Sequence, residues 1–297
     1  MLEKLPSGAK VLIIRLRSLG DCVLTTPAIY ILRRHRPDLR VAVMVEDRFA
    51  DIFRGNPDVD AVLPAHPAAA LIWKPALTIN FHGGGRSVWL TLASMARYRA
   101  GFGHFRNRYI YNLHVPRAQE ILDDERTVHT AEHMASAIFW LGAKRTEIPR
   151  ARLHAPVVPA EKPYAVIHAL ASAAGKSWPA ERFIEVARTL QHLEPIFIGG
   201  PGDDLSKFGE FRTQVNPSLK DTMVLMQSAS LFIGNDSGPA HMAAAFNVPL
   251  VVLFGESDPV IWAPWRAHAQ TLVANGAMDR IQTAEVLAAI EALGVAA

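Results

Sequence analysis

The sequence has almost no cysteine and no long hydrophobic run. Cys22 is the only cysteine among 297 residues, which excludes an intrachain disulfide and is typical of a reducing compartment. The longest unbroken apolar runs, residues 68–73 and 249–254, are far shorter than the roughly 20 residues that a membrane-spanning helix needs. The first residues lack the apolar core and cleavage site of a signal peptide. These absences predict a soluble cytoplasmic protein.

Charge is unevenly distributed, although the net charge is only +3. Residues 1–157 hold 22 Lys and Arg against 14 Asp and Glu, a net charge of +8. Residues 158–297 hold 9 against 14, a net charge of −5. The basic first half predicts an anionic partner. Nucleic acid is not the expected partner, because the sequence contains no recognisable binding module and no long run of Lys and Arg.

Buried strands and helices alternate in two successive sets, separated by a proline-rich segment at residues 155–163. The expected strands are residues 11–16, 41–46, 61–63 and 77–81 in the first set, and 164–169, 195–198, 230–233, 248–254 and 270–273 in the second. Such alternation is typical of parallel sheets with helical crossovers. The pattern therefore predicts an α/β protein of two doubly wound, Rossmann-like domains, residues 1–157 and 158–297, that face each other across a cleft.

The turn after the expected strand at residues 230–233 has the features of an anion site. Pro239 opens a short helix, since proline is favoured where an unpaired N–H would otherwise lie. Asp236 and Ser237 are expected to cap the first amides, and Gly238 lets a ligand approach the backbone. A helix N-terminus at the end of a strand attracts phosphate. The alternative is an ordinary capped turn without a ligand.

The expected strand at residues 11–16 leads into a polar turn that contains Asp21. Pro27 leaves the start of the following helix open. Either Thr26 caps a helix whose first residue is Pro27, or the helix begins near Asp21 and tolerates Pro27 in an early turn. In both cases Asp21 lies at the carboxyl end of a strand, where open α/β sheets bind ligands. The alternative role for Asp21 is a helix cap.

Several basic residues follow expected strand ends. Lys176 lies in a strand-to-helix turn of small residues and is a candidate contact for phosphate, although a surface lysine is the alternative. Arg86 follows a run of three glycines. Residues 97–109 interleave arginines with aromatic residues, an arrangement that suits phosphorylated or carboxylated sugars. The alternative for this cluster is a solvated basic face.

One five-residue motif has the spacing of a zinc site. His129, Glu132 and His133 match H-x-x-E-H on a probable helix, and histidines four residues apart share a helix face. Such a short match arises easily by chance, and no glutamate stands out as a third ligand. We therefore predict no metal site.

Taken together, these motifs resemble glycosyltransferase family 9, the bacterial lipopolysaccharide heptosyltransferases, along nearly the whole chain. The motifs that carry the resemblance are residues 17–21 with 25–27, the turn at 82–87, Ser172, Lys176 and Trp178-Pro179, residues 199–201, and residues 235–241 followed by Phe254-Gly255 and Asp258-Pro259. Each motif alone is weak, whereas their number and order are specific.

The resemblance implies a GT-B fold, with the acceptor on the first domain and the nucleotide-sugar on the second. It implies inverting transfer of heptose from ADP-L-glycero-β-D-manno-heptose, with no metal or other cofactor. The implied acceptor is an anionic lipopolysaccharide precursor, the Kdo- or heptose-bearing inner core on lipid A. The basic first half could also hold the enzyme at the anionic inner leaflet of the inner membrane. The sequence does not define the oligomeric state.

The resemblance also assigns roles to residues. Asp21 would be the catalytic base, and the donor would contact Ser172, Lys176, Asp203, Asp236, Ser237, Gly238 and His241. Asp203 stands where relatives often carry glutamate, which leaves that contact open. The acceptor candidates are Gly20, Arg86 and Arg106. The remaining alternatives are a GT-B enzyme with another nucleotide-sugar donor, an epimerase, and a non-catalytic nucleotide-sugar-binding protein.

Overall fold

A computed structural model describes residues 1–171 and 177–295 of the chain. It divides into two compact units, residues 1–154 (unit 1) and 155–297 (unit 2). The boundary lies within a few residues of the one expected from the proline-rich segment. In the described part of the chain, no helix is both long and apolar enough to cross a membrane.

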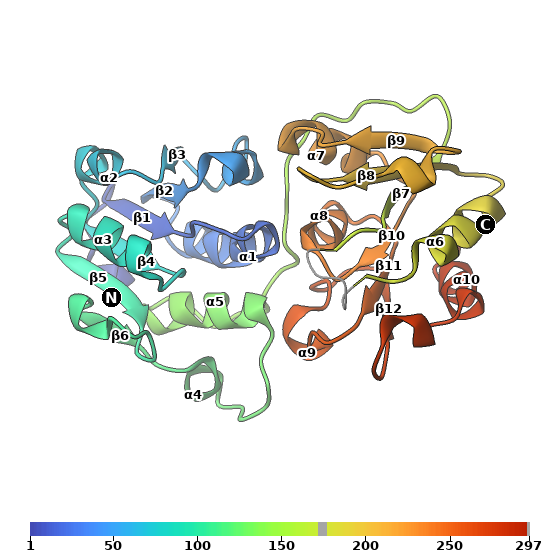
Figure 1. The fold of residues 1–297 in the computed structure, drawn as a ribbon. Helices are drawn as coiled ribbons and strands as arrows, with labels where there is room; N and C mark the ends of the chain where they lie inside the picture. The colour runs from blue at the N-terminus through green and yellow to red at the C-terminus, as the bar shows by residue number, and fades with distance from the viewer. Residues whose placement is uncertain (172–176, 296–297) are drawn as a thin grey trace. The chain divides into compact units, whose positions relative to one another are not determined.

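Unit 1 contains a six-stranded sheet with flanking helices, in the strand order β3-β2-β1-β4-β5-β6, and all its strands run parallel (Figure 1). The strands are β1 (Lys10–Ile14), β2 (Arg40–Val45), β3 (Ala61–Pro64), β4 (Leu77–Asn80), β5 (Tyr98–Phe102) and β6 (Leu113–Val115). The helices are α1 (Leu19–His35), α2 (Pro67–Trp73), α3 (Gly85–Ala93), α4 (Ala118–Leu122) and α5 (Thr130–Trp140). Helix α1 packs against α5, and α2 packs against α3.

Unit 2 repeats this architecture, with the strand order β12-β11-β10-β7-β8-β9 and all pairs parallel. The strands are β7 (Tyr164–His168), β8 (Glu194–Gly199), β9 (Arg212–Val215), β10 (Leu231–Asn235), β11 (Leu250–Phe254) and β12 (Ala269–Val273). The helices are α6 (Ala180–Thr189), α7 (Leu219–Gln227), α8 (Gly238–Phe246), α9 (Pro259–Trp262) and α10 (Thr283–Ala292). Helix α6 packs against α10, and α7 against α8.

The central strands are buried along most of their length, as expected for a parallel sheet covered on both faces. In unit 1, Leu12 and Ile14 of β1 pack with Leu90 of α3. In unit 2, Ile167 of β7 belongs to a core that includes Phe183 of α6 and Ile290 of α10. The predicted α/β class with two doubly wound sheets is therefore confirmed.

Helix α1 begins at Leu19, close to the second of the two predicted starts, but Pro27 is its ninth residue and lies in the interior rather than in an early turn. A proline removes the N–H that would bond the carbonyl four residues earlier, which here is that of Val23. The Thr26 hydroxyl donates to the Val23 oxygen at 2.8 Å and satisfies it instead. The side chain next to the proline thus explains how this helix continues without a break.

Candidate active site

Asp21 lies in the first turn of α1 and is held on both carboxylate oxygens. Its Oδ2 accepts hydrogen bonds from the Ser18 backbone N–H at 3.2 Å and from the Ser18 hydroxyl at 3.1 Å. Its Oδ1 accepts from the guanidinium of Arg15. The side chain is still 20% exposed. Asp21 is therefore a capping residue at the start of α1 and also a solvent-reachable carboxylate at the carboxyl end of β1.

Arg15 follows β1 directly, and its side chain is only 9% exposed. Besides Asp21, it donates to the Phe81 carbonyl oxygen at 2.5 Å, just beyond the end of β4. Burial lowers the pKa of the guanidinium, and the neighbouring Asp21 carboxylate opposes that shift. A buried charge is tolerated only when it is paired and hydrogen-bonded. Arg15 thus joins the ends of two adjacent strands and fixes the Asp21 carboxylate.

A hollow of about 640 Å³ opens beside Asp21, and we call it the unit 1 hollow. Its walls come from the residues that follow β1, β2 and β4, namely Arg15, Arg17, Ser18, Asp21, Arg48, Phe49 and His82. From β1 the chain adds strands on one side of the sheet, β2 and β3, and from β4 it adds them on the other side, β5 and β6. Open α/β sheets bind ligands at such a switch point, here between β1 and β4. The hollow therefore has the position expected of a binding site.

Asn80, the last residue of β4, organises one wall of the unit 1 hollow. Its Oδ1 accepts from the backbone N–H groups of His82 and Gly83 at 2.9 and 3.0 Å. Its Nδ2 lies 2.9 Å from the Tyr111 hydroxyl and within 3.1 Å of two further hydroxyls on α3, and its two N–H groups are shared among these three oxygens. This network fixes the backbone from which His82 projects. Burial lowers the pKa of His82, and the charge of Arg15 adds to that effect.

In unit 2 the residues that the sequence predicts for an anion site lie in the turn between β10 and α8. Ser237 occupies the N-cap position, and Gly238 is the first helical residue. Within the described residues, however, the Ser237 hydroxyl makes no capping bond, so its predicted capping role is wrong. It lies 3.1 Å from Nδ1 of His168 at the end of β7. Burial lowers the pKa of His168 to about 4, so its imidazole is neutral at pH 7. The Ser237 hydroxyl is hydrogen-bonded to this imidazole instead of to the helix amides.

The other predicted donor residues lie around the same end of the unit 2 sheet. Asp203 accepts the Gly200 N–H at 2.7 Å and closes the turn after β8. His241 is buried in α8, and Asp236 donates its backbone N–H to Leu253 of β11 at 2.9 Å. The predicted phosphate contacts Ser172 and Lys176 lie outside the described residues. The strand ends of unit 2 thus gather Asp203, Asp236, Ser237, Gly238 and His241 at one edge of the sheet.

The predicted acceptor residues do not line the unit 1 hollow. Gly20 is buried as the second residue of α1, and Arg106 is exposed after β5. Arg86 donates to Glu46 Oε1 at 3.3 Å and to the Ala65 carbonyl at 3.0 Å.

Sequence reasoning did not single out Arg17, Arg48 or His82 as site residues, although all three line the hollow with Asp21. Each of these residues comes just after an expected strand, and the carboxyl ends of parallel strands meet at one edge of the sheet. That position in the sequence could have indicated that they lie near Asp21.

The three residues of the H-x-x-E-H motif make structural contacts at the start of α5. His129 is the N-cap of α5 rather than a helical residue, and its Nδ1 accepts the Ala131 N–H at 3.1 Å. Glu132 accepts from the His129 N–H and pairs with Arg126 at 2.6 Å. The His133 ring stacks on Phe102 at 3.9 Å. No group of three His, Cys, Asp or Glu residues suited to a metal occurs in residues 1–171 and 177–295.

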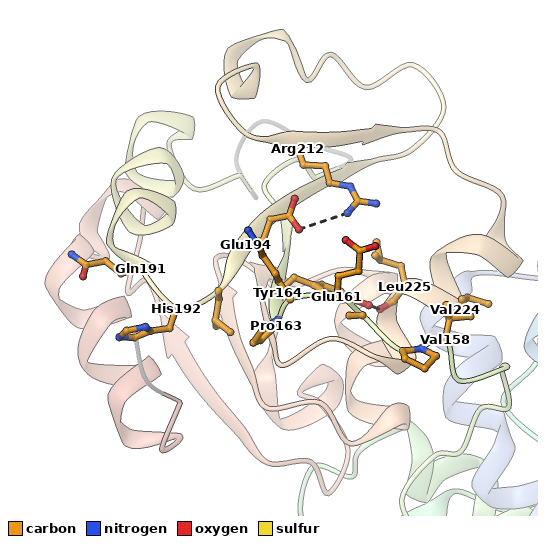
Figure 2. Close-up of a pocket in the computed structure, with 14 residues that line it drawn as sticks. Val158, Glu161, Pro163, Tyr164, Gln191, His192, Glu194, Arg212, Val224 and Leu225 are labelled. Atoms are coloured by element: carbon orange, nitrogen blue, oxygen red, sulfur yellow. Dashed lines mark hydrogen bonds and ion pairs between the residues drawn. The ribbon is translucent and has the colours of Figure 1, made fainter.

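A second hollow, of about 790 Å³, lies in unit 2 (Figure 2). It is lined by residues 158–164 and by the chain around the amino ends of β8 and β9, where Arg212 pairs with Glu194 at 3.7 Å. It is larger than the unit 1 hollow, yet it lies at the edge of the sheet opposite to the β10–α8 turn. Ligands of open α/β sheets bind at the carboxyl ends of the strands, so this hollow is not the expected nucleotide site.

The two sheets of equal strand order define a class of protein, the GT-B type of α/β fold. The solved structure of a family 9 glycosyl transferase from Veillonella parvula aligns with a TM-score of 0.86, at 22% identity, over 97% of both chains. The structure of E. coli ADP-heptose lipopolysaccharide heptosyltransferase II aligns with a TM-score of 0.81, at 18% identity, over 96% of this chain and 98% of that one. These likenesses establish the fold.

A family model, glycosyltransferase family 9 (heptosyltransferase), matches residues 76–287, more than half of the chain. The chain therefore belongs to glycosyltransferase family 9, and it is a glycosyltransferase. Among its curated relatives is lipopolysaccharide heptosyltransferase 3 of Escherichia coli, 26% identical over 295 residues, which covers 83% of each chain. The family expected from the sequence motifs is thereby confirmed.

Proposed function

We propose that this enzyme transfers heptose from ADP-L-glycero-β-D-manno-heptose to a Kdo- or heptose-bearing inner-core acceptor of lipopolysaccharide. The transfer inverts the anomeric centre and uses no metal or other cofactor. The observation that carries the sugar and the acceptor class is the similarity, over most of the chain, to lipopolysaccharide heptosyltransferases of Escherichia coli and Haemophilus influenzae.

Asp21 is the proposed general base. A carboxylate offers about four lone-pair positions. Arg15 and Ser18 occupy three of them, which leaves one position on Oδ1 for an acceptor hydroxyl. In the proposed reaction Asp21 takes the hydroxyl proton and the acceptor oxygen attacks the anomeric carbon. The bond from that carbon to the phosphate oxygen breaks, and ADP leaves with the bonding electron pair.

The unit 2 turn is the proposed donor site. The N-terminus of α8 carries partial positive charge, and Gly238 at its first position lets the pyrophosphate approach the backbone. Ser237 and His241 border this turn, Asp203 and Asp236 lie nearby, and Ser172 and Lys176 would complete the phosphate contacts. Together they would stabilise the negative charge that develops on ADP as it departs.

The acceptor is proposed to bind unit 1, whose excess of Lys and Arg suits phosphate and carboxylate groups. Gly20, Arg86 and Arg106 remain acceptor candidates. The same charge would attract the anionic inner leaflet without insertion, so we place the enzyme in the cytoplasm at the inner face of the inner membrane.

Thermal unfolding with ADP, UDP, GDP and TDP, each with and without magnesium, tests the donor. A ligand at about 100 times its dissociation constant stabilises the native state by roughly 2.7 kcal/mol. We expect a shift of the unfolding temperature with ADP, of equal size with and without magnesium. A shift with another nucleotide alone would replace the donor and keep the fold, and product analysis would then distinguish a transferase from an epimerase.

Replacement of Asp21 tests the base. Asp21→Asn removes the basic carboxylate, so we expect kcat to fall at least about 100-fold. The amide keeps an oxygen that can accept from Arg15, so the fold and ADP binding should stay unchanged. Asp21→Ala should also destabilise unit 1 by about 3 kcal/mol, because it strands the buried Arg15 charge. The matched control is Asp51→Asn, which removes a carboxylate from the ion pair with the exposed Arg54. Unchanged turnover in the Asp21→Asn variant would remove Asp21 from its role.

A further inference from the structure

We propose that the hollow in unit 2 binds a small zwitterion with an apolar body, the class of molecule to which short apolar peptides belong. The ligand's carboxylate would bind Arg212, its ammonium group would bind Glu194, and its apolar part would lie near Val224. The hollow lies at the amino ends of the strands, whereas the proposed donor turn follows the carboxyl end of β10. The inference therefore concerns a second site and does not depend on the proposed function.

The charges that line the unit 2 hollow balance each other. Two acidic and two basic side chains line it, namely Glu161, Glu194, Lys162 and Arg212. A purely anionic ligand would lie against the carboxylates, and a purely cationic ligand would lie against the basic groups. Like charges placed together at a binding surface are unfavourable. A molecule that carries both charges can pair with both kinds of side chain.

The ion pair between Arg212 and Glu194 is open. The nearest nitrogen and oxygen of the two side chains are 3.7 Å apart, which is beyond hydrogen-bond distance. A second Arg–Glu pair of unit 2, Arg188 with Glu210, is about as exposed but forms two hydrogen bonds of 2.7 and 3.1 Å. Arg212 and Glu194 therefore keep their hydrogen-bonding groups available for a carboxylate and an ammonium group of one ligand.

The polar and apolar side chains of the hollow are separated. Figure 2 shows Glu161 and Glu194 extending toward Arg212, with Val158 and Val224 to one side of them. Small-molecule sites commonly combine an apolar surface with a few polar groups that fix the orientation of the ligand. A zwitterion with an apolar side chain matches this arrangement.

Hydrogen bonds hold the walls of the hollow in place. The Ser228 hydroxyl donates to the Val158 carbonyl oxygen at 2.9 Å, and the Tyr164 hydroxyl donates to the Leu225 carbonyl oxygen at 2.6 Å. The volume of about 790 Å³ lies within the roughly 300–1,000 Å³ of small-molecule sites. A preformed site loses less conformational entropy when its ligand binds.

Four forms of one dipeptide test the charge requirement. Leucyl-leucine, its N-acetyl form, its C-terminal amide and the form blocked at both ends are titrated into the enzyme by calorimetry or ligand-observed NMR. The free dipeptide should bind most tightly, and the loss of either charge should weaken binding about tenfold, as expected for one charge-assisted hydrogen bond. Saturating ADP should leave these affinities unchanged, because the donor turn lies at the other edge of the sheet.

Variants assign each charge to its partner. Arg212→Gln should remove the advantage of a free carboxylate and keep that of a free amine, and Glu194→Gln should do the reverse. Both side chains are exposed, so neither replacement should impair folding. The matched controls are Arg188→Gln and Glu210→Gln, which change an equally exposed pair outside the hollow and should keep all four affinities.

The proposal is wrong if none of the four forms binds, or if all four bind equally. It is also wrong if the control variants weaken binding as much as Arg212→Gln does. Competition between the dipeptide and ADP would place the dipeptide in the donor site and would also contradict the proposal. None of these results depends on heptose transfer, so the proposed function stands or fails separately.

Discussion

The two units are built alike, and one position shows how they differ. Strand β4 of unit 1 and strand β10 of unit 2 occupy equivalent places, each beside the first strand of its unit. Both end in a buried asparagine, Asn80 and Asn235, and both have a glycine three residues later, Gly83 and Gly238. The similarity ends with the partners of the two asparagines.

Asn80 accepts from the amides of the turn that follows it, and so it fixes that turn from within. Asn235 accepts from the Trp178 N–H at 3.0 Å and donates to the Ala169 carbonyl at 2.9 Å, both outside its own turn. Unit 1 therefore uses its asparagine to hold a wall of the Asp21 hollow. In unit 2 the asparagine fastens neighbouring segments and does not engage the turn proposed to bind the donor pyrophosphate.

The largest expected effect comes from removal of the two asparagines. Asn80→Ala should destabilise unit 1 by about 3 kcal/mol or more, because it leaves the buried Tyr111 hydroxyl and two turn amides without their partner. Asn235→Ala should destabilise unit 2 by about 2 kcal/mol, since only two groups lose a partner. Denaturant unfolding followed by hydrogen exchange, read peptide by peptide, assigns each loss to its unit.

The matched control for this pair is Asn112→Ala, which removes two hydrogen bonds of similar length from an exposed side chain. Water replaces its partners, so we expect a loss below about 1 kcal/mol. Equal losses for Asn80→Ala and Asn235→Ala would show that the turn amides contribute nothing and that the two asparagines stabilise their units to the same extent.

The two glycines provide the next test. Gly83 has a φ of +72°, and an added Cβ would lie 2.6 Å from the Phe105 ring. Gly83→Ala should therefore destabilise unit 1 by about 2 kcal/mol and disturb the acceptor wall. Gly238 is the first residue of α8 and has a helical backbone that alanine also adopts, so we expect Gly238→Ala to cost less stability than Gly83→Ala. Instead it should weaken ADP binding, measured by calorimetry, and an unchanged ADP affinity would argue against close backbone approach there.

The sequence predicted the parts of this molecule that depend on local pattern. The apolar runs gave the central strands, because a strand covered on both faces has no polar alternation to obscure it. Asp21 was found because it follows such a run. The start of α1 stayed open, since the bond from Thr26 to the Val23 carbonyl that compensates Pro27 cannot be read from residue types alone.

Pairings between distant segments escaped prediction. Arg48 lies 27 residues beyond Asp21 along the chain, and only the parallel pairing of β1 with β2 brings them to one hollow. The Ser237 hydroxyl was assigned to the helix amides, whereas His168, from another strand, lies beside it. Side chains at strand ends have several possible partners, and the three-dimensional register chooses among them.

Each unit contains one histidine whose protonation makes the stability of that unit depend on pH. Burial lowers the pKa of His133 in unit 1 and of His168 in unit 2 to about 4, from an ordinary value of 6.5. The charges of His104 and Arg15 add to the shift at His133, whereas Asp203 opposes it at His168. Because the folded state disfavours the protonated form, the associated stability is fully present above pH 6.5 and is lost as the pH falls towards 4.

The smallest expected effect follows from this shift. Between pH 7 and pH 5.5 each histidine should contribute a loss of about 1 kcal/mol in the free energy of unfolding of its own unit. His133→Asn should flatten the pH dependence of unit 1 only, and His168→Asn that of unit 2 only, in hydrogen-exchange stabilities corrected for the intrinsic rate at each pH. Asparagine at position 168 can keep a hydrogen bond with Ser237. If His168→Asn keeps the stability of unit 2 at pH 7 but removes its pH dependence, protonation of His168 is the cause of that dependence. A slope that persists in both variants would mean that other groups, and not His133 and His168, carry the acid sensitivity.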